Sequence, residues 1–187
     1  MTGVVLRSGE RIPAQAVVLA VGHSARDTFR MLLERKVPME AKAFAVGLRI
    51  QHPQDMIDLS QYGPGGGEIL GAASYKLTHQ TPGGRGVYSF CMCPGGYVVN
   101  ASSEPGRLAV NGMSYHARDG ENANSALIVT VTPEDFGGEG PLAGVEFQRR
   151  LEERAYRLGR GAIPVQLYGD FKENRESREA GEVKPQM

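Results

Sequence analysis

The N-terminal forty residues alternate between short apolar runs and polar breaks, and the pattern predicts three small elements in succession. Two apolar runs joined by a Ser-Gly pair predict a β-hairpin over residues 2–12. Residues 16–21 are continuously apolar and rich in valine. Such a run is typical of a strand that is buried on both faces, so a buried strand is expected here.

A glycine and a capping signal follow this run and predict a helix. Gly22 interrupts the apolar residues, and Ser24 with Asp27 three positions later fits a helix-capping box. Apolar residues then recur at helical spacing as far as Pro38. A helix is therefore predicted over residues 25–35, with Ser24 as its N-cap.

Beyond Pro38 the pattern changes to short strands separated by turn residues. A strand is expected over residues 44–51, a short helix over 53–62 and a flexible glycine loop over 64–67. Further strands are predicted over residues 71–78, 86–90, 97–101, 108–111 and 125–131. This spacing favours an antiparallel or mixed sheet, or an open barrel.

The C-terminal part begins with the clearest helical pattern, over residues 144–158. Its apolar stripe comprises Phe147, Leu151, Ala155 and Leu158, and the pairs Glu146–Arg150 and Glu153–Arg157 have the spacing of helical ion pairs. From residue 170 onward nine of eighteen residues are charged, which favours a linker. The expected organisation is an end segment of one domain (1–37), a second domain (38–170) and a charged linker (171–187).

Composition narrows the class of protein. The chain has 187 residues, of which 25 are glycine, whereas average usage would give about 13. This excess, with 11 prolines, argues against a helical bundle. Lysine and arginine balance aspartate and glutamate, so no nucleic-acid partner is indicated. No apolar run is long enough to span a bilayer, no signal peptide pattern opens the chain, and two cysteines make no disulfide scaffold. We expect no membrane partner and a cytoplasmic location.

The glycine turn after the buried run is the first candidate for chemistry. Glycine lets another molecule approach the backbone closely, and the helix N-terminus beyond it favours an anion. The alternative is an ordinary strand-to-helix turn. No Gly-x-Gly-x-x-Gly sequence occurs in the chain, so it carries no complete phosphate-binding loop.

Cys91 and Cys93 are the second candidate. If both were extended, their thiols would face one side with Cα atoms roughly 6.6 Å apart, near the upper limit for a disulfide. The pair could be redox-active, or it could bind zinc together with His79 and His116, although the spacing matches no standard zinc pattern. The simplest alternative is two small buried cysteines at the end of a strand.

A polar segment over residues 111–124 is the third candidate. It contains His116, Arg118, Asn122 and Asn124, which suit a polar ligand or a carboxylate. The alternative is a solvated surface loop. A fourth segment, residues 71–79, offers only Lys76 and His79 as weak candidates.

These segments together resemble a known family. Residues 17–28 resemble the second conserved motif of flavoproteins, in which an apolar strand ends in Ala-x-Gly beside the flavin. Residues 90–97 and 111–124 are similar to segments of the bacterial uncharacterised FAD-dependent dehydrogenases. The resemblance implies that this chain is a central part of a longer polypeptide, whose dinucleotide fingerprint lies before it and whose remaining flavin domain lies after it.

The resemblance leads to a specific set of expectations. FAD would contact Val21, Gly22 and His23, and the substrate would contact Arg118, Asn122 and Asn124; the catalytic candidates are Cys91, Cys93 and His116. The fold expected is α+β, with a mixed or mainly antiparallel sheet or open barrel that follows a strand–turn–helix piece of a flavin-binding α/β domain. The cofactor expected is FAD, no metal is expected, and the partners are a small-molecule substrate and the rest of the flavoprotein. The alternative is a non-catalytic α+β domain that binds a ligand or another protein.

Overall fold

The predicted hairpin and helix both form in the N-terminal unit, Met1–Pro38. In the computed structural model, which describes residues 2–180, 185 and 187, β1 (Gly3–Val5) pairs antiparallel with β2 (Arg11–Pro13). Helix α1 (Arg26–Glu34) follows. The predicted cap is wrong, because Ala25 occupies the N-cap position without a side-chain hydrogen bond. The Ser24 hydroxyl instead lies 3.3 Å from His23 Nε2.

The apolar run over residues 16–21 does not form the buried strand that its sequence predicts. It has no regular secondary structure, and Val18 and Leu19 are 87% and 54% exposed. A strand is held by hydrogen bonds to a neighbouring strand. The described residues of this unit provide only the two short strands of the hairpin, which pair with each other.

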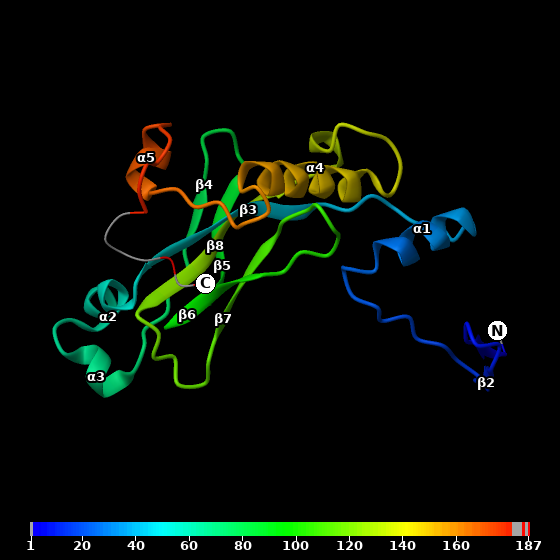
Figure 1. Cartoon of the computed structure of the whole chain (residues 1–187), viewed down its shortest axis with the longest axis horizontal. Coiled ribbons are helices and arrows are strands. Elements are labelled where there is room, and N and C mark those ends of the chain that lie inside the picture. The colour runs from blue at the N-terminus through cyan, green and yellow to red at the C-terminus, as the bar shows by residue number, and fades with distance from the viewer. Residues whose placement is uncertain (1, 181–184, 186) are drawn as a thin grey trace. The chain divides into compact units, whose positions relative to one another are not determined.

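The second unit, Met39–Met187, is built on a four-stranded antiparallel sheet of order β3-β8-β5-β4 (Figure 1). Its strands are β3 (Phe44–Pro53), β4 (Thr78–Gln80), β5 (Gly86–Cys93) and β8 (Asn122–Val131). A hairpin of β6 (Gly96–Asn100) and β7 (Val110–Ser114) contacts β8 and β5. The remaining elements are α2 (Gln54–Tyr62), α3 (Gly66–Leu70), the 3-10 turn η1 (Pro133–Asp135), α4 (Ala143–Leu158) and α5 (Tyr168–Lys172).

The mixed α+β fold with antiparallel sheets is thus confirmed, and the sheets do not close into a barrel. Two local predictions are wrong. Residues 66 and 67 of the predicted glycine loop belong to α3. Of the strand predicted over 71–78, only Thr78 lies in a strand, as the first residue of β4. The backbone of Ala73 bonds to side chains of α2 instead of a strand: its N–H donates to Asp58 Oδ1 at 2.7 Å, and its carbonyl accepts from Gln54 Nε2 at 3.0 Å.

The two faces of the large sheet have different covers. Side chains alternate between faces along a strand, so Phe44 and Arg49 of β3 point in opposite directions. Phe44 packs against Phe136 and against Phe147 of α4, with ring centroids 5.0 and 6.2 Å apart. On the opposite face Arg49 reaches Asn111 of β7. One face therefore carries the aromatic core beneath α4, and the other carries a polar contact with the β6–β7 hairpin.

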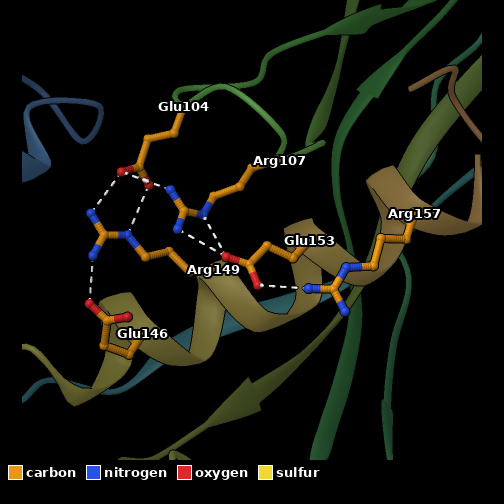
Figure 2. A network of polar contacts seen from close by, with 6 residues as sticks. All are labelled: Glu104, Arg107, Glu146, Arg149, Glu153 and Arg157. Carbon is orange, nitrogen blue, oxygen red and sulfur yellow. Dashed lines mark hydrogen bonds and ion pairs between the residues drawn. The ribbon is translucent and has the colours of Figure 1, made fainter. Parts of the chain in front are cut away.

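Charged side chains fix α4 to the loop between β6 and β7, as Figure 2 shows. Arg149 donates to both carboxylate oxygens of Glu104 at 2.9 and 2.7 Å, and Arg107 bridges Glu104 and Glu153. The predicted pair of Glu153 with Arg157 is present at 3.8 Å. Glu146 pairs with Arg149 at 2.5 Å, whereas Arg150 donates to the Phe136 carbonyl. Because Arg149 makes a two-oxygen contact, this network holds the loop in one orientation.

The apolar stripe of α4 packs only in part. Phe147 joins the core of Val131, Phe136 and Ala143, but Leu151 is 39% exposed and Leu158 is 78% exposed. The C-terminal segment forms the short helix α5, and residues 181–184 and 186 of the predicted linker lie outside the described residues. The domain boundaries 1–37, 38–170 and 171–187 stay a prediction.

We predict that Gly144→Ala destabilises the second unit. A Cβ at this position would lie 2.8 Å from Phe44 Cε1 and 3.2 Å from Phe136 Cε2, so two core rings would have to move. Overpacking of this kind costs about 1–3 kcal/mol of unfolding free energy, which exceeds the helix-propensity gain. Urea denaturation measures the change. Gly169→Ala in α5 is the matched control, since its Cβ would meet nothing within 4 Å. Equal stability of the two variants would contradict this packing.

Candidate functional site

Arg49 is the centre of the polar contact between the two sheets. Its guanidinium donates to Asn124 Oδ1 of β8, to the Cys91 carbonyl of β5 at 3.3 Å and to Asn111 Oδ1 of β7 at 3.3 Å. A Cβ at Gly112 would collide with Arg49 Nη1 and Asn124 Oδ1. The guanidinium therefore lies directly against the β7 backbone. This one side chain of β3 contacts three other strands, β5, β7 and β8.

The acceptors around Arg49 are neutral. They are two amide oxygens, one backbone carbonyl and, at 4.0 Å, the Cys93 sulfur. No carboxylate among the described residues forms an ion pair with this guanidinium. A half-buried positive charge without a counterion attracts negative charge to its surroundings more strongly than a solvated one does. The region around Arg49 is therefore suited to a negative group.

The two cysteines lie beside Arg49 and line different clefts. The strand register shifts between Phe90 and Cys93, and Cys91 has a φ of 46°, so the backbone is not extended there. The expectation that both thiols share one side required extended residues and does not hold. Both cysteines are free; Cys93 Sγ donates to the Cys91 carbonyl at 3.3 Å and lies 4.0 Å from Arg49 Nη1.

Cys93 lies in the wall of a cleft of about 530 Å³, here named cleft A. The residues that line cleft A are Met92, Cys93, Pro94, Ser114, Tyr115, His116 and Arg118. Three of the predicted site residues, Cys93, His116 and Arg118, thus meet in one place. None of the lining residues is acidic, and no carboxylate of the described chain pairs with Arg118. Cleft A therefore offers a cation, an imidazole and a thiol to a ligand.

A glycine turn supports the Arg118 side of cleft A. Gly95 has a φ of 50°, and a Cβ there would collide with the Arg118 carbonyl. Gly95 N–H donates to Gln54 Oε1 at 2.8 Å, and Gly120 N–H donates to the Gly95 carbonyl at 3.2 Å. Only glycine fits both this conformation and this contact, so the turn seats the loop that carries Arg118.

Asn122 and Asn124 do not line cleft A. They are 1% and 0% exposed, and Asn124 accepts the hydrogen bond from Arg49. Their predicted role in binding substrate would therefore be indirect, through the position of Arg49 and of strand β8.

A second cleft of about 230 Å³, cleft B, contains Cys91. It is lined by Ser74, Tyr75, Lys76, Ser89, Phe90, Cys91 and Met92. The Tyr75 hydroxyl lies 2.9 Å from His52 Nε2. Burial raises the pKa of Tyr75, although Ser125 and the charge of Arg49 oppose this, and burial lowers the pKa of His52. Both groups are thus favoured in their neutral forms, which suits a hydrogen-bonded pair in a half-buried place.

The predicted flavin contacts lie in the N-terminal unit. Gly22 has a φ of 75°, which favours glycine, and no heavy atom lies within 4 Å of the position that a Cβ would take. Val21 is 46% exposed, and His23 is also exposed. A flavin contact at residues 21–23 stays a prediction.

The described residues contain no group of three or more His, Cys, Asp or Glu side chains that could hold a metal ion. In particular, His79 lies on β4 and lines neither cleft. No helix in the described part of the chain is long and apolar enough to cross a membrane.

Sequence reasoning missed Arg49, His52 and Tyr75. For Arg49 a signal existed, because it is the only charged residue of an otherwise apolar and amide-containing strand. Such a charge on a central strand needs partners from neighbouring elements. The pairing of His52 with Tyr75 joins residues 23 positions apart, and no spacing in the sequence indicates it.

The second unit is thus a mixed α+β fold with a cationic cleft beside a bulged strand. A family model described as "FAD-dependent protein, C-terminal domain-like" matches residues 43–187. The chain therefore belongs to this family. The description names a C-terminal domain, which differs from the central position that the resemblance implies.

One relative extends the comparison to the N-terminal unit. The chain is 58% identical over 182 residues to an uncharacterized protein of Clostridium beijerinckii, and the match covers 95% of this chain. The same match covers 34% of the relative. The chain thus spans about a third of the length of the curated relative that it matches.

We predict that His52 lowers the stability of the protein as the pH falls below 6.5, the ordinary pKa of a histidine side chain. Its pKa is lower in the folded state, so the unfolded chain binds the extra proton in this range and unfolding becomes more favourable. His52→Gln removes the titrating ring. The free-energy difference between wild type and variant, from urea denaturation at about pH 8 and about pH 5, should therefore shift against wild type at the lower pH. A pH-independent difference would contradict the burial of this ring.

Proposed function

We propose that the chain is the substrate-binding part of an FAD-dependent oxidoreductase, a dehydrogenase whose flavin exchanges a hydride with a small carboxylate-bearing substrate in cleft A. Membership of the FAD-dependent family supports the flavoprotein assignment. The observation that carries the substrate assignment is cleft A itself, where Arg118 faces the solvent without a carboxylate partner among the described residues and no lining residue is acidic.

Arg118 is proposed to hold the substrate carboxylate. A guanidinium can donate two parallel hydrogen bonds to a carboxylate, which fixes both position and orientation. The φ of 53° at Arg118 and its seat on the Gly95 turn hold the backbone of this residue in one conformation. His116 and Cys93 line the same cleft and are the candidate residues for proton movement near the substrate.

FAD is proposed to lie against Val21, Gly22 and His23. When bound, FAD supplies the two-electron acceptor that the chemistry of a dehydrogenase requires. Gly22 leaves its backbone open to a ring system, and the N-terminus of α1 favours a nearby negative group. The residues of this chain would bind only part of the cofactor, because the chain has no Gly-x-Gly-x-x-Gly loop for the pyrophosphate.

The rest of the flavoprotein is proposed to cover the apolar run over residues 16–21. These side chains are exposed in this chain. The part of the curated relative outside the match is about twice as long as the matched part. An apolar run of this type gains most by joining a parallel sheet in a dinucleotide-binding domain. The fragment alone would then lack the complete flavin site and be inactive.

The test is Arg118→Ala in the longer flavoprotein to which we assign this chain. Anaerobic bleaching of the visible flavin absorbance by a panel of small carboxylic acids measures the rate at which each acid reduces the flavin. Loss of one charge-assisted contact should lower the rate of flavin reduction at sub-saturating acid by at least about tenfold. Flavin content and unfolding free energy should remain near those of wild type. Arg157→Ala is the matched control, because Arg157 is 79% exposed and outside cleft A.

Three results would contradict the proposal. A longer protein that purifies without flavin would favour the alternative of a non-catalytic binding domain. Equal losses of stability and of flavin reduction in Arg118→Ala would make Arg118 a structural residue. If the acids reduce the flavin equally well in Arg118→Ala and in Arg157→Ala, cleft A is not the substrate site.

A further inference from the structure

We infer that Cys93 is a nucleophile that forms a thioether with small carbon electrophiles carrying a carboxylate, held in cleft A by Arg118. The inference rests on the anion site of the proposed function but does not involve FAD. In the covalent step the sulfur gives an electron pair to the electrophilic carbon. The leaving group departs with its bonding electrons, and the thiol proton passes to solvent, so no oxidant or reductant is needed.

The Cys93 sulfur is held at the wall of cleft A. The bulge in β5 turns this thiol into cleft A, and the Cys91 carbonyl at 3.3 Å accepts its S–H hydrogen bond. The side chain is only partly exposed, so the sulfur is fixed at the wall of the cleft instead of moving freely in solvent. A fixed nucleophile beside a bound ligand reacts faster than a free one, because less orientational freedom is lost.

Cationic side chains lie near this sulfur. Arg49 Nη1 lies 4.0 Å from Cys93 Sγ, and Arg49 has no carboxylate partner in the described chain. An anionic reagent that approaches this sulfur therefore meets a cation without a counterion. Arg118 adds a second cation on the wall of the same cleft. A carboxylate-bearing electrophile is therefore favoured over a neutral one of similar size.

Cys91 provides a comparison within the same molecule. It is exposed and lines cleft B, not cleft A. Arg49 contacts its backbone carbonyl at 3.3 and 3.5 Å, while the hydrogen bond to a sulfur atom goes to Cys93. Exposure alone would make Cys91 the more reactive thiol, whereas the present inference predicts the reverse for anionic reagents.

The experiment is alkylation of this chain with iodoacetate and with iodoacetamide at neutral pH and low salt, with each cysteine followed by peptide mass spectrometry. The iodoacetate-to-iodoacetamide rate ratio should be about fivefold higher at Cys93 than at Cys91, the size expected for one exposed charge contact. Arg118→Ala should lower this ratio at Cys93 toward the value at Cys91, with Arg49 still beside the sulfur. Arg157→Ala, a matched change outside the cleft, should leave it as in wild type.

A ratio that is equal at the two cysteines, or that Arg118→Ala does not alter, would overturn the inference. Acetate, which has the carboxylate but no leaving group, separates this failure from failure of the proposed function. If acetate shifts the NMR signals of His116 while Cys93 shows no preference for iodoacetate, the anion site stands and the nucleophile is wrong. If acetate shifts no signal of cleft A and the ratio is equal at both cysteines, both proposals are wrong.

Discussion

The contact between the Arg49 guanidinium and its neutral acceptors is the interaction on which the second unit depends. It joins β3 to β8 through Asn124, to β5 through the Cys91 carbonyl and to β7 through Asn111. A charged group in such a place has given up water, and fixed dipoles must replace it. Removal of Arg49 would leave Asn124, which is fully buried, without its hydrogen-bond donor. The hairpin of β6 and β7 therefore lies against the large sheet through a polar contact, while α4 covers the opposite face with aromatic rings.

The same contact gives the site its chemical character. Because Arg49 holds the Cys91 carbonyl, the bulge in β5 keeps Cys91 and Cys93 in separate clefts. Because its acceptors carry no formal charge, the guanidinium leaves a positive field beside cleft A. Arg118 contributes to this field from a loop that rests on the Gly95 turn. Structural and chemical roles thus coincide, and a change at Arg49 affects both.

Local signals in the sequence predicted much of the fold. Apolar runs between turn residues and helical spacing identified the hairpin, β3, α2, β5, β8 and α4 to within a few residues. Cys93, His116 and Arg118 were each candidates, but their meeting in one cleft was not predicted. The buried strand over residues 16–21 failed, because its pattern describes burial in a sheet that the described chain does not provide. The strand over residues 71–78 failed because side chains of α2 satisfy the Ala73 backbone. Arg49 and the pair of His52 with Tyr75 depend on contacts between distant segments, which no local pattern records.

The most direct measurement of the central claim is a double-mutant cycle between Arg49 and Asn124. The unfolding free energies of wild type, Arg49→Met, Asn124→Ala and the double variant give the coupling between the two side chains. A hydrogen bond from the guanidinium to the buried Asn124 amide should give a coupling of at least about 1 kcal/mol, with each single variant strongly destabilised. If the two changes add to within about 0.3 kcal/mol, the side chains act independently and the account of this contact is wrong.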